Sequence, residues 1–79
     1  MARRQAPALA VGIAGLGNIG TEVARWLAAA APRSLRLAAV AGRDRGAIVE
    51  RLAALGIEAE AVALDALAGR CDVVVDCLA

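Results

Sequence analysis

A glycine-rich turn directly after a short apolar segment is the feature that most constrains this chain. The apolar segment covers residues 9–14, and the six residues that follow are Gly15-Leu16-Gly17-Asn18-Ile19-Gly20, with the spacing G-x-G-x-x-G. A continuous apolar run of this length is typical of a strand buried on both faces, and a helical pattern begins at the end of the turn. The sequence therefore predicts a strand, a tight turn and a helix in direct succession.

Each glycine of this turn has a separate physical role if the turn binds a dinucleotide. Gly15 allows the sharp turn, Gly17 lets a pyrophosphate approach the backbone, and Gly20 lets the helix pack closely on the first strand. The amino terminus of the helix supplies unpaired N–H groups and a partial positive charge. We expect residues 15–20 to cradle a pyrophosphate; the alternative is a tight turn with a structural role only.

Helical and strand patterns alternate through the rest of the chain. The first helix is expected to bury a stripe of apolar side chains at positions i, i+4, i+8 and i+11 and to stop at Pro32. The second helix is expected to follow Asp44 and to end at Gly56. The third is expected over residues 63–68 and ends at Gly69. The stripes are Ile19, Val23, Leu27 and Ala30 in the first helix, and Ile48, Leu52 and Leu55 in the second. Strands are expected over residues 35–40, 57–61 and 73–78.

This order, β-α-β-α-β-α-β, indicates an α/β fold with a parallel sheet and right-handed crossovers. We predict the first half of a doubly wound Rossmann sheet, with strand order 3-2-1-4. The first two helices should cover one sheet face and residues 63–68 the other, which leaves the last strand as an open apolar edge. Residues 1–8 are expected to form a flexible arm, and residues 9–79 a partial NAD(P)-binding domain, truncated before the remaining strands and a catalytic domain.

Two further segments are candidates for cofactor contacts. NAD-preferring domains place an acid at the end of the second strand, where this chain has Gly42, followed by Arg43 and Asp44. An arginine there pairs with a 2′-phosphate, so NADP or dual use is favoured over strict NAD, while Asp44 is expected chiefly as a helix cap. Cys77 and Leu78 lie at the carboxyl end of the last strand, where backbone atoms would line the nicotinamide side; the alternative is simple continuation of the strand.

Composition excludes several classes of function. A chain of 79 residues holds one small core, and a net charge of +1 argues against nucleic-acid or anionic-membrane binding. The apolar stretch behind Arg3 and Arg4 is too short and too quickly broken for a convincing targeting signal, so we expect a cytoplasmic protein. Cys71 and Cys77 match no metal or redox spacing and are expected as buried thiols. Trp26, on a helix beyond the turn, is expected in core or interface packing.

Three stretches together resemble a known family: residues 11–20, residues 37–44, and residues 71–77. The chain looks like the amino-terminal domain of bacterial L-aspartate dehydrogenases and is more loosely similar to homoserine dehydrogenases and to the glucose–fructose oxidoreductase/inositol dehydrogenase group. The resemblance covers nearly the whole chain after residue 8. Its motifs are specific for fold and cofactor and less so for substrate, because Asp76-Cys77-Leu78-Ala79 departs from the family pattern after the fourth strand.

The resemblance implies hydride transfer between C2 of L-aspartate and NAD(P), with iminoaspartate as the oxidised product. It also implies cofactor contacts from Gly15, Gly17, Gly20, Arg43 and Asp44, and a full-length homo-oligomer. The catalytic histidine and the substrate groups of the family lie in a later domain, and this chain has no histidine, so it offers no catalytic residue. A non-catalytic NAD(P)-sensing module and an inactive truncated product remain as alternatives.

Overall fold

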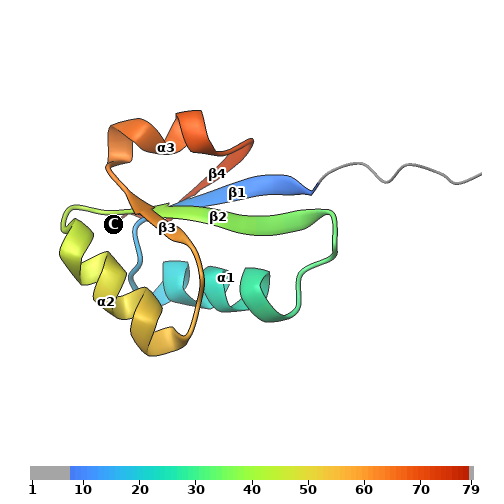
Figure 1. Ribbon diagram of the computed structural model, residues 1–79, viewed down its shortest axis with the longest axis horizontal. Helices are drawn as coiled ribbons and strands as arrows, with labels where there is room; N and C mark the ends of the chain where they lie inside the picture. Colours follow the sequence, from blue (N-terminus) through green and yellow to red (C-terminus); the bar gives the residue numbers. More distant parts are fainter. Residues whose placement is uncertain (1–7, 79) are drawn as a thin grey trace, which may run out of the picture.

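The computed structural model describes residues 8–78, which form one alternating series of strands and helices (Figure 1). The elements in chain order are β1 (Leu9–Ala14), α1 (Asn18–Ala29), β2 (Leu35–Ala41), α2 (Arg45–Leu55), β3 (Glu60–Val62), α3 (Leu64–Arg70) and β4 (Val73–Asp76). The predicted succession of elements is therefore confirmed. Most of the predicted arm lies in residues 1–7, outside the described residues.

All four strands lie in one parallel sheet with the order β3-β2-β1-β4, as predicted. β1 is flanked by β2 on one side and by β4 on the other, so the chain reverses its direction of travel across the sheet after β3. Such a reversal opens a crevice at the carboxyl ends of the strands on either side of it, and ligands of open α/β sheets bind there. The glycine-rich turn follows β1 directly and therefore lies at this edge.

The helices form layers on both sides of the sheet. Figure 1 shows α1 and α2 together below the sheet and α3 alone above it, as the right-handed crossovers predict. Ile13 of β1 and Val40 of β2 are fully buried in the core that these strands form with α1 and α2. A second cluster, around Leu67, lies under α3. The short helix α3 is the only helix within residues 8–78 on this face, and it contacts β1, β2 and β4.

The buried face of α1 differs from the predicted stripe. The helix buries Gly20, Thr21, Ala24 and Leu27. Of the predicted stripe only Leu27 is buried; Ile19 is 72% exposed, Ala30 is exposed, and Val23 is half-buried. The stripe was wrong because the glycine turn, which the apolar pattern ignores, presses Gly20 against Gly15 and so fixes the rotation of the helix.

Several element boundaries also differ from the sequence prediction, most of them by one or two residues. β3 begins at Glu60, so Ile57 and Ala59 pack on the core outside the ladder, while Glu58 between them is exposed. β4 ends at Asp76, two residues before the predicted end, and α3 continues through Gly69 to Arg70. The ends of α2 agree with prediction: Asp44 accepts a hydrogen bond from the N–H of Ala47 at 3.1 Å, and Gly56 ends the helix with a φ of 68°.

The two edge strands of the sheet carry different side chains. At β3, the Nε of Arg45 donates to the carbonyl oxygen of Ala61 at 2.9 Å, and Glu60 forms an ion pair with Arg70. At β4, Val73 and Val74 are 45% and 41% exposed. Charged side chains therefore occupy the β3 edge and oppose pairing with another strand there, whereas β4 is the open apolar edge that the sequence predicted.

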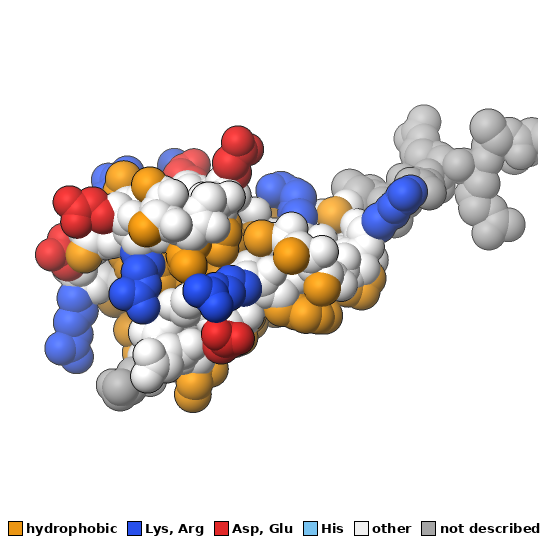
Figure 2. Space-filling view, turned by 90° about the horizontal axis from the view of Figure 1, so that it is seen from below, with side chains coloured by type: hydrophobic (Ala, Val, Ile, Leu, Met, Phe, Trp, Pro, Cys, Tyr) orange, Lys and Arg blue, Asp and Glu red, His pale blue; other side chains and the backbone are white. Residues whose placement is uncertain are grey.

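Hydrophobic side chains also reach the outer surface of the helices. Figure 2 looks onto α1 and α2 and shows hydrophobic side chains exposed between arginine side chains. Trp26 is 48% exposed on α1, so of the two expected roles, core or interface packing, the core role is wrong and interface packing stays a prediction. None of the helices within residues 8–78 combines the length and the apolar character needed to cross a membrane.

Candidate functional site

The turn between β1 and α1 is held by the sheet on one side and by the segment after β4 on the other. The N–H of Gly15 donates to the carbonyl oxygen of Ala41 at 2.7 Å. Its φ of 94° lies in the region that favours glycine, and a Cβ there would stand 3.0 Å from the carbonyl oxygen of Cys77. Gly15 is thus required twice, by its own backbone conformation and by the close passage of the chain at Cys77.

Gly20 is required for internal packing as well. A Cβ on this residue would overlap the carbonyl group of Gly15. The close approach was expected between the helix and the first strand, and it occurs between the helix and the first residue of the turn. Side chains of any kind are therefore excluded at both ends of the motif by the protein's own backbone.

Gly17 differs from the other two glycines because nothing in the protein's own packing requires it. It has an ordinary φ of −88°, and a Cβ built on it would meet no atom within 4 Å. The space in front of Gly17 is open to solvent. The absence of a Cβ at this position therefore lets a ligand approach the backbone more closely. Close approach of a pyrophosphate to the backbone is the role that we expected for Gly17 from the sequence.

The first turn of α1 leaves its backbone donors free for such a ligand. Gly17 is the N-cap residue, and neither a side-chain cap nor an acidic residue is present in the first turn. The N–H of Thr21 is the first to find a helical partner, the carbonyl oxygen of Gly17, at 2.9 Å. The N–H groups of Asn18, Ile19 and Gly20 therefore face the amino end of the helix without partners inside it, where the helix dipole favours an anion.

A groove of about 340 Å³ lies directly beside this helix end. It is lined by Gly17, Asn18, Ile19, Asp76, Cys77 and Leu78. The structure thus brings together two segments that the sequence proposed separately, the glycine turn and the residues after β4. Its volume is at the low end of the range of small-molecule sites, which is about 300–1,000 Å³, and suits one part of an extended ligand.

Asp76 lines this groove but was not among the predicted site residues. It is the last residue of β4, it stands opposite Ala14 in the ladder, and its side-chain Oδ1 accepts a hydrogen bond from the N–H of Leu78 at 3.0 Å. The signal available in the sequence was its position, since an acid at the carboxyl end of the strand next to β1 must lie near the glycine turn.

Arg43 and Asp44 lie at the carboxyl end of β2, at the same edge of the sheet but outside the groove. Both side chains are exposed, and Asp44 caps α2 as described above. Gly42 has a packing reason of its own, because a Cβ there would stand 3.0 Å from the Cδ1 of Ile48. A small residue at this position therefore serves the approach of α2 to the sheet, whatever cofactor is bound.

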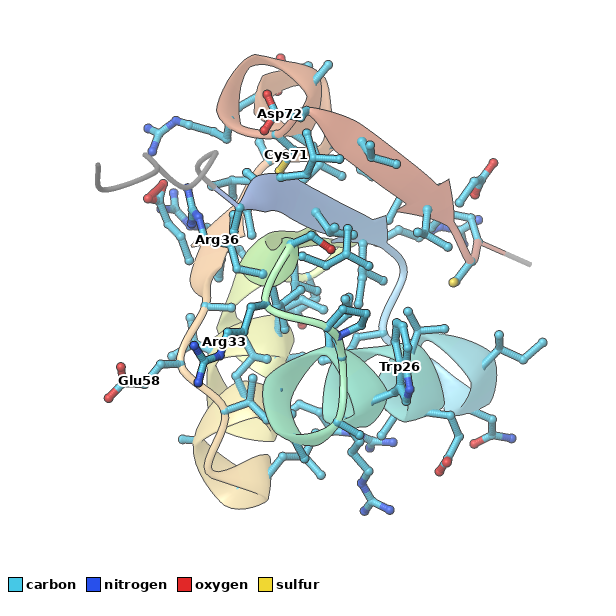
Figure 3. All side chains as sticks on the ribbon, turned by 90° about the vertical axis from the view of Figure 1, so that its right-hand side faces the viewer. Trp26, Arg33, Arg36, Glu58, Cys71 and Asp72 are labelled. Atoms are coloured by element: carbon cyan, nitrogen blue, oxygen red, sulfur yellow. The ribbon has the colours of Figure 1, made fainter. Side chains whose placement is uncertain are left out.

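Cys71 and Cys77 lie at opposite ends of β4. Figure 3 shows Cys71 and Asp72 at the start of this strand, beside β1, at the end of the sheet away from the groove. Burial, and next the neighbouring Asp72 carboxylate, raise the pKa of the Cys71 thiol. A Cβ on Gly12 would stand 2.6 Å from its sulfur. Both thiols are half-buried, so the expectation of buried thiols was wrong: Cys71 is protonated and packs against the cluster under α3, and Cys77 borders the groove.

Comparison with known proteins agrees with this architecture, which is that of half a Rossmann-type α/β sheet. Residues 15–79 match the family model described as the NAD binding domain of homoserine dehydrogenase, and the chain belongs to this family. It is similar to L-aspartate dehydrogenase 3 of Bordetella bronchiseptica, with 42% identity over 69 residues. The resemblance to these dehydrogenases expected from the sequence is therefore confirmed.

That similarity covers 87% of this chain and 25% of the relative. The chain therefore spans about a quarter of the length of the curated protein it matches. No solved structure matches the chain. The family supports a nicotinamide dinucleotide as the cofactor and an oxidoreductase as the class of protein.

Proposed function

We propose that this chain is the dinucleotide-binding part of an NAD(P)-dependent dehydrogenase that acts on L-aspartate. The observation that carries the cofactor assignment is the open space in front of Gly17, at the uncapped amino end of α1. The similarity to a protein named L-aspartate dehydrogenase 3 supports the substrate. The reaction would transfer a hydride between C2 of aspartate and the nicotinamide ring, with iminoaspartate as the oxidised product.

The groove suggests how the cofactor would lie on this chain. The N–H groups of Asn18, Ile19 and Gly20 would bind the pyrophosphate, with Gly17 giving close access and Gly15 and Leu16 forming the turn beneath it. The segment Cys77–Leu78 would border the nicotinamide half, because it forms the other wall of the same groove. The chain's role is to bind and orient the dinucleotide and to keep its pyrophosphate over the helix end.

The adenosine end would lie toward the loop after β2. Gly42 stands where an NAD-preferring domain often has an acid, and the exposed Arg43 follows it. A guanidinium group there forms charge-assisted hydrogen bonds with a 2′-phosphate. We therefore propose that NADP binds at least as well as NAD, with Asp44 serving first as the cap of α2.

Substrate binding and proton transfer are assigned to residues outside this chain. The sequence has no histidine and no lysine, the groups that most often transfer protons near neutral pH. A substrate domain and a homo-oligomer, in the cytoplasm, complete the proposal. The test is aspartate-dependent reduction of NAD(P) by the full-length protein, which includes the proposed substrate domain, measured by nicotinamide absorbance with homoserine and other amino acids as controls. Tight dinucleotide binding without turnover on any of them would favour a sensing module.

A further inference from the structure

The groove beside Gly17 contains one charged side chain, that of Asp76. The position of this residue is fixed from both sides. In the parallel ladder it stands opposite Ala14, and the next residue donates its N–H to the carbonyl oxygen of Ala14 at 2.7 Å. Asp76 is therefore held by the sheet itself at the groove wall that faces the amino end of α1.

No cationic side chain in the described part of the chain neutralises this carboxylate. The ion pairs within residues 8–78 join Arg25 with Glu22 and Arg70 with Glu60. The contact that the Asp76 side chain makes is the hydrogen bond from the N–H of Leu78 to Oδ1. A ligand in the groove therefore meets a fixed and uncompensated negative charge on the side of β4.

The charge of a nicotinamide dinucleotide differs between its two redox forms only at the ring. The oxidised ring carries a positive charge, the reduced ring carries none, and the phosphates and the adenosine are the same in both. If the pyrophosphate lies on the amino end of α1, the nicotinamide half extends along the wall formed by residues 76–78. A carboxylate there attracts the oxidised ring and has no comparable attraction for the reduced one.

We propose that Asp76 is a specificity-determining residue for the redox state of the bound dinucleotide and favours the oxidised form. The inference rests on the proposed dinucleotide site and goes beyond it by naming what the second wall of the groove selects. Repulsion between Asp76 and the phosphates does not obscure the effect, because it is the same for both redox forms and cancels in the ratio of their affinities.

The test is calorimetric titration of the protein and of its Asp76→Asn variant with NADP⁺, NADPH, NAD⁺ and NADH. Asparagine keeps an oxygen that accepts the hydrogen bond from Leu78, so the loop is preserved while the charge is removed. For each cofactor pair, the ratio of the dissociation constant of the reduced form to that of the oxidised form should fall about three- to tenfold in the variant, as expected for a screened charge pair. Most of the change should be weaker binding of the oxidised form.

Asp65→Asn on α3 is the matched control, since it removes an exposed carboxylate outside the groove and should leave the ratio unchanged. An unchanged ratio in Asp76→Asn, or an equal loss for both redox forms, overturns the role of Asp76 and leaves the dinucleotide site standing. If the unmodified protein binds neither form, the proposed function fails and the role of Asp76 fails with it.

Discussion

The N–H of Cys77 donates a hydrogen bond to the carbonyl oxygen of Ala14 at 2.7 Å, one residue beyond the end of β4. This bond extends the ladder between β1 and β4 to the point where the glycine turn begins. The carbonyl oxygen of Cys77 then passes so close to Gly15 that only a residue without a Cβ fits there. The two walls of the groove are therefore joined through the backbone of Ala14, Gly15 and Cys77.

Gly17→Val should abolish dinucleotide binding and leave the fold intact. The valine side chain would occupy the open space in front of the helix end, where the proposed pyrophosphate lies, and its Cβ would meet no protein atom within 4 Å. Titration with NADP and NAD, together with circular dichroism, measures both parts. Gly69→Val is the matched control, because Gly69 also has open space around its Cβ position and lies outside the groove. Unchanged affinity in a folded Gly17→Val protein would disprove the phosphate site.

Gly20→Ala, unlike Gly17→Val, should directly lower the stability of the fold. Its Cβ would overlap the carbonyl group of Gly15, so α1 must shift away from the turn. Overpacking of this kind costs about 1–3 kcal/mol in the free energy of unfolding. Urea denaturation measures the loss, and Gly17→Ala in the same helix turn serves as the control that should lose far less. Equal stabilities of the two variants would contradict the packing argument.

Arg43→Ala should weaken NADP binding much more than NAD binding. Loss of charge-assisted hydrogen bonds to a 2′-phosphate is expected to cost about 1.5–3 kcal/mol of binding free energy. Paired calorimetric titrations of both cofactors measure the difference. Arg51→Ala, which removes an exposed arginine from α2, should leave both affinities unchanged. An equal loss for NADP and NAD in Arg43→Ala would remove the support for NADP.

Residues 1–79 expressed alone should show no dehydrogenase activity and little stability as a monomer. The chain lacks histidine and lysine, α3 alone covers one sheet face, and Val73 and Val74 stand exposed at the edge. Size-exclusion chromatography, thermal melting and a nicotinamide absorbance assay with aspartate measure these properties. A monodisperse monomer with a cooperative melt would contradict the stability argument, and turnover of aspartate would contradict the claim of inactivity.

The sheet order could be predicted from the sequence because it follows from general rules. Helices between successive strands force parallel crossovers, and the handedness of those crossovers places α1 and α2 on one face and α3 on the other. The caps of α2 were also predictable, since Asp44 and Gly56 act through their own local chemistry. Both kinds of inference depend on residue type and order, which the sequence contains.

The rotation of α1 and the part that Asp76 plays in the groove were not predicted, although Cys77 and Leu78 of the same wall were. Apolar periodicity favoured Ile19 as a core residue, but contact between Gly20 and Gly15 turns Ile19 toward the groove. Asp76 was missed because its importance arises from its neighbours in space, the segment Gly17–Ile19, which lie far from it in sequence. A tertiary contact decides the rotation of α1, and no local pattern of residues reports it, whereas Asp76 could have been found from the predicted strand order.

The unequal edges of the sheet also bear on how the chain behaves before it is fully folded. A growing sheet pairs with other chains wherever backbone groups lie open beside apolar side chains. Within residues 8–78 that is β4, since Arg45 of α2 binds the backbone of β3 and Glu60 of β3 pairs with Arg70 of α3. Within the described residues, aggregation should therefore begin by pairing of other chains with the β4 edge. The time for which Val73 and Val74 stay uncovered during synthesis, more than the overall stability of the core, would then determine the yield of native protein.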